Sequence, residues 1–360
     1  MRARSGWLGA EPQSTARRLA LLSLLPASWG YGAAARLHRS LHHRGWLRST
    51  RLPCRVVSIG SLVAGGSGKT PAAAWLAAEL LRRGHRVALA SRGYGRAGRE
   101  RVSVVSDGRF VHGRAETAGD EPMLLAARAP GVPVLVGRDR VLAGWRALSA
   151  FGAEVLVLDD GFQHHRLCRD IDIVVLDGAF GLGNARTLPS GPLREPVNGL
   201  RRADAVGAVD APLGPEDEER IERFAPEAFR FEAHRRPASL RALRGGPRQS
   251  PELLRGAEVG MLCGLARPAS LRRSLEGLGA RVVAERCFRD HHRYRPQDVQ
   301  GLARAAPLWI TTEKDAGKIV PTWTGGADLR VLSIEFDVVA PKELLDWIEA
   351  RLRRPPAQRP

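Results

Sequence analysis

Cysteines, lysines and long apolar runs are all scarce in this chain of 360 residues. Its four cysteines are widely spaced and form no CxxC pair, which argues against a disulfide scaffold or a cysteine zinc site and favours a reducing compartment. The apolar run at 19–25 is far shorter than the roughly 20 residues that cross a bilayer. Hydrophobic residues make up 44% and charged residues 26% of the chain, which excludes a disordered chain, a collagen-like fibre and a multi-pass membrane protein.

Positive charge is abundant, but arginine carries almost all of it. Lysine and arginine together number 56 against 38 acidic residues, a formal net charge of +18. Such a field favours a polyanionic partner, either nucleic acid or an anionic membrane surface. Only four of the basic residues are lysines, namely Lys69, Lys314, Lys318 and Lys342. Where arginine is so strongly preferred, a retained lysine is a candidate for a position that needs a compact point charge.

The N-terminal region admits three interpretations. Arg17 and Arg18 precede the apolar run, and a basic stretch at 36–44 leads to Trp46. The favoured interpretation is a retained interfacial segment from Arg17 to Trp46, whose apolar side chains insert among lipids while arginines face the headgroups. A helix packed on the following domain and a cleaved signal peptide remain open.

From residue 55 onward, short apolar segments of strand length alternate with helical segments. This alternation predicts an α/β fold of the P-loop NTPase type, in which helices cover both faces of a mostly parallel sheet, with a smaller C-terminal α/β domain and an N-terminal membrane-interface helix. Strands are expected at 56–59, 86–90, 133–136, 154–158, 171–176, 259–263, 282–283, 308–311 and 331–334. Helices are expected at 70–83 and 139–150 and around residues 271, 298 and 344. The expected boundaries are 1–50 for the membrane-associating segment, 51–235 for the P-loop domain, 236–254 for a linker rich in Arg, Pro and Gly, 255–352 for the smaller domain and 353–360 for a tail.

The strongest motif is a glycine-rich loop directly after an expected strand and directly before an expected helix. It reads Val63, Ala64, Gly65, Gly66, Ser67, Gly68, Lys69 and Thr70. In a P-loop the small residues let backbone N–H groups surround phosphate oxygens, the lysine neutralises the β- and γ-phosphates, and the hydroxyl helps to hold Mg²⁺. Val63 replaces the usual first glycine, and Gly65 and Gly66 are candidates to supply the missing flexibility.

Two adjacent carboxylates end the expected strand at 154–158. Asp159 and Asp160 lie where ligands bind in open α/β sheets, so together with the P-loop they predict a Walker-B-type acid for Mg²⁺. The sequence leaves open which of the two is the direct ligand. Asp120 and Glu121 form another acidic pair in a turn before a helix, where simple N-terminal charge complementarity is the alternative explanation. Other polar segments at expected strand ends are 91–96, 138–140 and 288–292.

The motifs, taken in order, resemble one known family. They are IGSLVAGGSGKTP at 59–71, SRGYGR at 91–96, GDEP at 119–122, VGRDR at 136–140, DDGFQHHRL at 159–167, LPSGPLREP at 188–196, DHH at 290–292 and TTEKDAGK at 311–318. In this combination they are similar to the tetraacyldisaccharide 4′-kinases, the lipid A 4′-kinases of Gram-negative bacteria. The P-loop alone is unspecific, and the ordered set carries the resemblance.

The resemblance implies an ATP- and Mg²⁺-dependent kinase that phosphorylates the 4′-hydroxyl of tetraacyldisaccharide 1-phosphate during lipid A biosynthesis. It implies a peripheral enzyme at the cytoplasmic face of the bacterial inner membrane, with no nucleic acid and no obligate protein partner, whose smaller domain closes the active-site cleft. Carried over by motif, the catalytic residues are Lys69, Asp120 as general base and His291 as its partner. The nucleotide lies against residues 63–70, the metal residues are Thr70, Glu121, Asp159 and Asp160, and the substrate residues are Arg92, Arg140 and Gln163.

Two other functions share parts of this motif set. A P-loop ATPase or GTPase that acts as a partner-binding switch would share the phosphate loop and the acids at 159–160, but it would not need Asp120 and His291. A nucleic-acid-stimulated ATPase would explain the basic excess, although no aromatic-rich binding module is evident. An acylated, anionic acceptor explains both the basic excess and the N-terminal segment.

Overall fold

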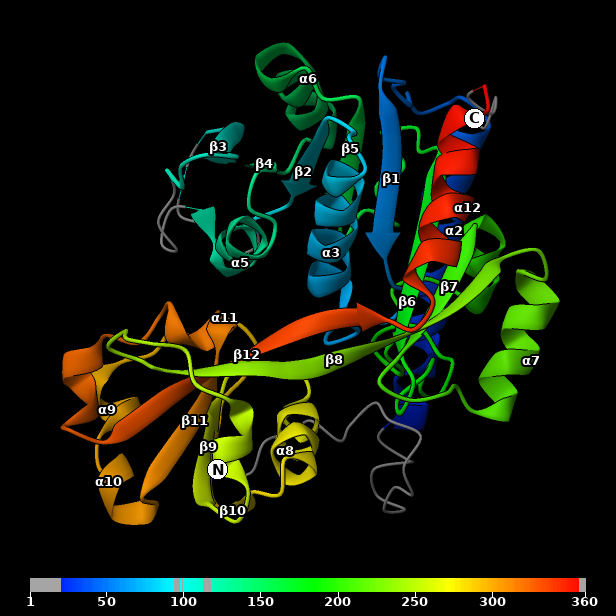
Figure 1. The fold of residues 1–360 in the computed structure, drawn as a ribbon. Helices are drawn as coiled ribbons and strands as arrows, with labels where there is room; N and C mark the ends of the chain where they lie inside the picture. Colours follow the sequence, from blue (N-terminus) through cyan, green and yellow to red (C-terminus); the bar gives the residue numbers. More distant parts are fainter. Residues whose placement is uncertain (1–20, 94–97, 99, 113–117, 356–360) are drawn as a thin grey trace. The chain divides into compact units, whose positions relative to one another are not determined.

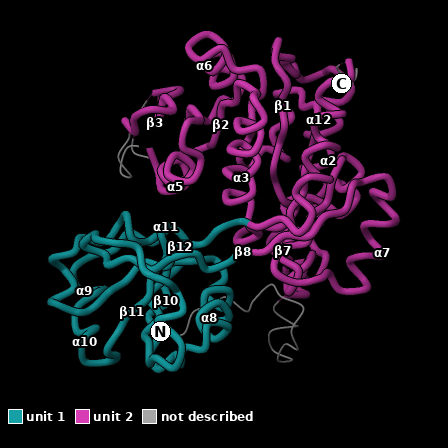
Figure 2. The backbone as a smooth tube through the Cα atoms, in the orientation of Figure 1, with its two compact units in different colours: residues 1–5, 235–336 teal, residues 6–234, 337–360 magenta. Residues whose placement is uncertain are grey.

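The computed structural model describes residues 21–93, 98, 100–112 and 118–355. They form two compact units, coloured separately in Figure 2. Residues 235–336 make up the small unit, and the described residues before 235 and after 336 make up the large unit. The chain leaves the large unit within strand β8 (Phe229–Ala242) and returns to it within strand β12 (Asp328–Val338).

The sheet of the large unit is parallel apart from one edge. Its described strands follow the order β3-β4-β2-β5-β1-β6-β7, with β8 next to β7 (Figure 1), and only the β3–β4 pair is antiparallel. Strands β5 and β6 are buried along their whole length, as expected for strands covered on both faces. The bounds are β1 Arg55–Gly60, β2 Val87–Ser91, β3 Val102–Asp107, β4 Pro133–Gly137, β5 Val155–Asp159, β6 Ile171–Asp177 and β7 Ala205–Val209.

Helices of the large unit pack on this sheet. They are α2 Leu25–His43, α3 Lys69–Arg82, α5 Asp120–Arg128, α6 Arg140–Phe151, α7 Pro215–Phe224 and α12 Pro341–Arg353. The predicted fold class is confirmed. The prediction omitted β3, β7 and α7. The sequence of β7, AVGAV, is a weak strand signal because it contains a glycine. The ring of Phe231 occupies the space that a Cβ on Gly207 would need.

Helix α2 contacts the loop at 187–190 of the large unit through Ser28 and Gly32. The Ser28 hydroxyl donates to the Thr187 carbonyl (2.9 Å), the Thr187 hydroxyl donates back to the Ser28 carbonyl (2.8 Å), and the Ser190 N–H donates to the Ser28 hydroxyl (2.8 Å). Gly32 faces Thr187 closely enough that a Cβ would lie 3.4 Å from its hydroxyl. The first residues of the predicted 17–46 segment, up to residue 20, lie outside the described part of the chain. None of the helices in the described part is long and apolar enough to cross a membrane.

The small unit contributes the remaining strands of the sheet order and has its own core. Its strands follow the order β10-β9-β11-β12-β8, with β9 Glu258–Cys263, β10 Arg281–Cys287 and β11 Leu308–Thr312. The β9–β10, β9–β11 and β11–β12 pairs are parallel. Helices α8 Pro268–Gly277, α9 Pro296–Val299, α10 Leu302–Ala305 and α11 Glu313–Ala316 connect them. Two apolar clusters fill this unit, one of them around the buried ring of Trp309.

The structure differs from the expected domain boundaries at two places. Residues 236–242 of the expected linker continue β8, and Leu240 and Gln249 exchange backbone hydrogen bonds in both directions (2.9 and 2.8 Å). The helix near residue 344, which was expected in the smaller domain, is α12 and belongs to the large unit. It is held there by an ion pair between Arg351 and Asp204 (3.2 Å) and by ring contact of Trp347 with Phe229.

Candidate active site

The phosphate-binding loop joins β1 to α3 and owes its shape to three glycines. Gly65, Gly66 and Gly68 have φ angles of 81°, 42° and 87°, a region that side chains with a Cβ rarely adopt. Gly68 precedes the first residue of α3, so the loop delivers its backbone to a helix N-terminus. A helix start with exposed N–H groups favours an anion. The backbone therefore fits a bound phosphate chain.

Val63 is accommodated because its position does not require glycine. Its backbone is not among those with positive φ, and its side chain is 1% exposed within an apolar cluster that includes Leu62, Phe162 and Leu193. It also forms a β-bridge with Leu193. The valine thus fastens the start of the loop to the core, while the glycines that follow provide the turn.

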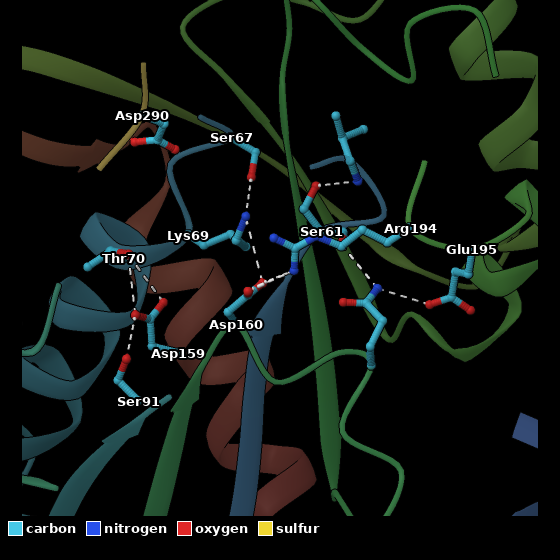
Figure 3. A network of polar contacts seen from close by, with 12 residues as sticks. Ser61, Ser67, Lys69, Thr70, Ser91, Asp159, Asp160, Arg194, Glu195 and Asp290 are labelled. Atoms are coloured by element: carbon cyan, nitrogen blue, oxygen red, sulfur yellow. Dashed lines mark hydrogen bonds and ion pairs between the residues drawn. The ribbon is translucent and has the colours of Figure 1, made fainter. Parts of the chain in front are cut away.

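Lys69 is buried at the centre of the site (Figure 3). Its Nζ lies 3.5 Å from the Ser67 hydroxyl and 3.7 Å from Oδ1 of Asp160, and its side chain is 11% exposed. Burial lowers the pKa of Lys69, and the nearby carboxylates, Asp160 first, oppose this effect. An ammonium this poorly solvated gains strongly from an additional anion. The site therefore favours a phosphate beside Lys69.

Asp159 and Asp160 have opposite electrostatic surroundings although they are neighbours. Burial, followed by repulsion from Glu121 and Asp160, raises the pKa of Asp159 to about 7. Burial acts in the same sense on Asp160, but the charges of Lys69 and Arg194 outweigh it and leave the pKa of Asp160 below its ordinary value. Asp159 thus lacks sufficient compensating positive charge, whereas Asp160 already has it.

The hydrogen bonds of the two acids agree with this difference. Asp159 accepts from the hydroxyls of Thr70 (3.2 Å) and Ser91 (3.4 Å), both of which are neutral. Asp160 has a φ of 56°. One guanidinium nitrogen of Arg194 donates to both of its carboxylate oxygens, at 2.7 Å each (Figure 3). A hydroxyl and a carboxylate without a cationic partner form a suitable protein contribution to an Mg²⁺ site, because Mg²⁺ keeps several waters and substrate phosphates as ligands.

No group of three or more His, Cys, Asp or Glu side chains in the described part of the chain is arranged as a metal cage. An Mg²⁺ ion that arrives with a nucleotide needs only one or two protein carboxylates, so a site built on Thr70 and Asp159 does not require such a group. Glu121 lies in the first turn of α5 and acts electrostatically on both Asp159 and Lys69. The structure thus brings together the predicted residues Lys69, Thr70, Glu121, Asp159 and Asp160.

Gln163 belongs to a network beside the loop. Its amide nitrogen donates to the Ser61 carbonyl (3.2 Å) and to Glu195 (3.0 Å), which is buried. Glu195 also accepts two hydrogen bonds from Arg202 and pairs with Arg39 of α2 at 3.5 Å. The amide oxygen of Gln163 is buried and makes no hydrogen bond within the described structure. Such an orphaned acceptor fits a hydroxyl-bearing ligand.

The predicted substrate arginines lie at neighbouring strand ends. Arg140 begins α6 and is buried; burial, with help from the charge of Arg92, lowers its pKa to about 10. Its guanidinium reaches the carbonyls of Gly137 (3.5 Å) and Arg138 (3.3 Å), and its Nε is buried without a hydrogen bond. Arg92 follows β2 and is exposed.

The acid–base pair is distributed over the two units. Asp120 begins α5 of the large unit, after Gly119 with a φ of 95°. His291 lies in the small unit and itself has a φ of 58°, which is uncommon for a residue other than glycine. Asp120 and His291 thus lie in different units, and their pairing stays a prediction.

Sequence reasoning assigned no role to Arg194, Glu195 or Arg202. The first two lie in the segment 188–196, whose letters were used only for the family resemblance. Charged residues in a loop ordinarily indicate a solvated surface, and nothing local signals that Glu195 is 4% exposed or that Arg194 reaches Asp160.

Comparison with known proteins places these residues in a family context. A family model described as tetraacyldisaccharide-1-P 4′-kinase matches residues 20–353. The chain is 45% identical over 356 residues to the tetraacyldisaccharide 4′-kinase of Anaeromyxobacter dehalogenans, covering 96% of this chain and 92% of that protein. It is 40% identical to the protein of the same name from Syntrophus aciditrophicus, with 94% of each covered. Among solved structures, LpxK from Aquifex aeolicus in complex with ATP matches with a TM-score of 0.72 and 32% identity, over 92% of this chain and 99% of that one.

Proposed function

Because the chain belongs to the tetraacyldisaccharide-1-P 4′-kinase family, we propose that its large unit binds ATP with Mg²⁺ and transfers the γ-phosphate to the 4′-hydroxyl of a tetraacyldisaccharide 1-phosphate in lipid A biosynthesis. The observation that carries the residue assignments is the junction of Lys69, Thr70 and Asp159 at the glycine loop. A nucleotide-dependent switch would share this junction, but the relatives are kinases of the disaccharide.

The residues around the loop divide the work of holding ATP. The backbone at 63–70 surrounds the phosphates, and Lys69 neutralises the β- and γ-phosphate oxygens. Thr70 and Asp159, with Glu121 nearby, would hold Mg²⁺, which when bound screens the charge of the phosphates. Asp160 keeps Lys69 and Arg194 in place rather than serving as the first metal ligand.

Proton removal from the acceptor falls to Asp120 with His291. In phosphoryl transfer most of the catalysis comes from positioning and charge neutralisation, yet the attacking hydroxyl must still lose its proton. Asp120 takes that proton, and His291 orients the carboxylate when the acceptor is bound. The helix start beside Asp120 favours its charged form, so Asp120 alone is a weak base and gains from a partner.

The acceptor is held by residues beside the transfer site. Arg92, Arg140 and Gln163 with Glu195 form the sugar and phosphate contacts in this proposal. Arg36 on α2 and Arg201 and Arg202 on the 3₁₀ segment 197–202 all act electrostatically on Arg39 of α2, and the carboxylate of Glu195 opposes them. Their excess positive charge suits the 1-phosphate of the acceptor.

The enzyme acts at a membrane surface in this proposal. Trp29, Tyr31, Leu37 and Trp46, on or just after α2, are 41–76% exposed, and arginines 36 and 39 lie on the same helix. Exposed aromatic and leucine side chains next to arginines are typical of peripheral attachment to anionic lipid. The location we propose is the cytoplasmic face of the inner membrane, where ATP is available.

The proposal is tested by incubating the purified full-length protein with ATP, Mg²⁺ and the disaccharide 1-phosphate. The expected product carries a second phosphate at the 4′ position, and its formation stops when Mg²⁺ is chelated. ATP hydrolysis without transfer, or hydrolysis that depends on added RNA or DNA, would instead indicate the switch or the nucleic-acid-stimulated ATPase.

A further inference from the structure

The segment TTEKDAGK at 311–318 has no role in the proposed chemistry, yet it places a lysine on the proposed partner of the base. Lys314 lies on α11, with its side chain 16% exposed. Its Nζ donates to Oδ1 of Asp290 at 2.7 Å and lies 3.4 Å from Nε2 of His291. Lys314 thus contacts both His291 and the preceding residue, Asp290.

Asp290 links Lys314 to the backbone of His291. The same Oδ1 that accepts from Lys314 accepts the His291 N–H at 3.0 Å. The turn is closed by the His292 N–H, which donates to the Arg289 carbonyl at 3.1 Å. A φ of 58° costs a residue with a side chain about 1 kcal/mol or more, so the surrounding contacts must hold it. Lys314 and Asp290 are among those contacts.

The rest of the segment fixes the position of Lys314. The Thr312 hydroxyl accepts the Asp315 N–H (3.2 Å) and donates to the Asp315 carboxylate (2.9 Å) at the start of α11. That carboxylate is 0% exposed and accepts the Gly264 N–H at 2.9 Å, which ties α11 to the end of β9. Lys314 therefore projects from an anchored turn rather than from a free loop.

The chemistry of the ammonium group defines what it does to the imidazole. A lysine ammonium only donates hydrogen bonds, so a hydrogen bond from Nζ requires the facing Nε2 to be an unprotonated acceptor. Oδ2 of Asp290 also faces Nε2 but lies farther away, at 3.8 Å against 3.4 Å for Nζ. A neutral imidazole with Nε2 unprotonated carries its hydrogen on Nδ1. An imidazolium form would place a second positive charge beside Nζ.

We propose that Lys314 is a positioning residue for phosphoryl transfer, which keeps the ring hydrogen of neutral His291 on Nδ1 and holds the 290–292 turn in its strained form. This inference rests on the proposed role of His291 toward Asp120. A neutral Nδ1–H orients a carboxylate while leaving it more basic than an imidazolium would, because it adds no full positive charge. The compact ammonium suits the position, because a planar guanidinium would pair with Asp290 through two nitrogens and displace the ring.

The direct test reads the tautomer of His291 by ¹⁵N NMR of the full-length protein, with His291→Gln to assign the signals. In the wild-type protein we expect Nδ1 protonated and Nε2 unprotonated at pH 8. In Lys314→Met we expect that pattern to be lost, with Nε2 becoming protonated beside the unopposed Asp290 carboxylate. An unchanged pattern in a folded Lys314→Met protein would overturn the proposal.

Kinetics give a second reading. Lys314→Met should lower kcat by about 10- to 100-fold with little change in KM for ATP, since only the geometry of the proton transfer is disturbed. Lys314→Arg keeps the charge but should displace the ring through its two-nitrogen pairing with Asp290, so it should lower kcat to a similar degree. A purely structural role for Lys314 would lower the thermal stability and kcat of its variants without changing the His291 ¹⁵N pattern.

Matched variants separate this proposal from the proposed function. Lys342→Met removes an exposed lysine on α12 and should leave kcat and the His291 signals unchanged. If His291→Ala retains full kcat, the role of His291 is wrong, while the NMR comparison still decides whether Lys314 sets its tautomer. If Lys314→Met does not fold, Asp290→Asn carries the test, because it removes the carboxylate that holds both Lys314 and the His291 N–H. An unchanged ¹⁵N pattern of His291 in that variant contradicts the proposal.

Discussion

Both units place a poorly exposed lysine beside an aspartate at the carboxyl ends of parallel strands, and the two pairs differ in what else surrounds them. In the large unit, Lys69 lies 3.7 Å from Asp160, next to three glycines with positive φ. In the small unit, Lys314 lies 2.7 Å from Asp290, next to an imidazole. Backbone N–H groups around the first lysine make it part of an anion site. A ring nitrogen beside the second makes it a means of orienting a side chain.

The largest effect that follows from this comparison concerns Lys69. Arginine retains the charge but spreads it over a plane that the glycine loop does not fit, so Lys69→Arg should fold normally and lose on the order of 10²-fold or more in phosphoryl transfer. Product formation and thermal unfolding measured side by side check this, with Lys342→Arg as the exposed control. Near-wild-type turnover would contradict the assignment of the phosphate loop.

The second prediction concerns whether Asp120 of the large unit and His291 of the small unit act together. Asp120→Ala and His291→Ala should each lower kcat by about 10²- to 10⁴-fold, while nucleotide binding measured by calorimetry persists. Because residues that act as a unit are not additive, the double variant should be little worse than the poorer single variant. Losses that simply multiply would mean that Asp120 and His291 have independent roles.

The third prediction sharpens the contrast between the two acids of the large unit. The pKa of Asp159 is about 7 in the folded protein against an ordinary value of 3.8. Between these pH values the folded protein holds a proton that the unfolded chain has released, so this group makes the free energy of unfolding fall as pH rises from about 4 to about 7. Asp159→Asn should therefore stabilise the cation-free protein at pH 8 and flatten this pH dependence.

Asp160→Asn is the matched control for that experiment and should have the opposite sign. The pKa of Asp160 is lowered by Lys69 and Arg194, so its charge contributes stability above the ordinary carboxyl pKa, and the contribution is lost as pH falls. Thermal unfolding across pH, with and without Mg²⁺ and ATP, measures both variants. Identical pH slopes in Asp159→Asn and the wild-type protein would show that Asp159 does not titrate in this range.

The smallest expected effect concerns the proposed attachment to lipid through the segment around α2 of the large unit. Trp29→Ser with Trp46→Ser should weaken binding to vesicles that contain anionic lipid by several-fold, and high salt should release the wild-type protein. Trp145→Ser, which changes a tryptophan that is 46% exposed on α6, is the control and should bind normally. Intact mass should show that residues 17–46 are retained, and a mature protein beginning near residue 35 would contradict the anchor.

The comparison of the units also shows which features a sequence can predict. The phosphate loop and Asp159–Asp160 were predictable because a parallel strand, a tight turn and a helix are contiguous in the chain, so local pattern specifies the local geometry. The contact of Lys314 with Asp290 was not, since 24 residues separate them and the pairing of β9 with both β10 and β11 brings their loops together. The role of Val63 was open for the same reason: its partner Leu193 comes from a distant loop.

Boundary errors had a different physical origin. The stretch near 235–250 is rich in Arg, Pro and Gly, which is typical of a linker, but its first residues continue the ladder of β8. Helix α12 has an ordinary amphipathic pattern, and such a pattern states that a face is buried without stating against which sheet. Tertiary pairing decided both cases.

The chain passes from the large unit to the small unit and back, and this determines how the small unit could be removed or replaced. Val339 donates to the Glu232 carbonyl (3.0 Å) and Leu243 donates to the Leu329 carbonyl (2.9 Å), so β8 and β12 run antiparallel and residues 235 and 336 face each other across the ladder. The small unit is therefore an insertion whose two ends are separated by about one strand spacing, roughly 5 Å. A two-residue hairpin turn between 234 and 337 could close that gap, so the insertion can be excised or exchanged as a module while residues 229–233 of β8, which pair with β7, are kept.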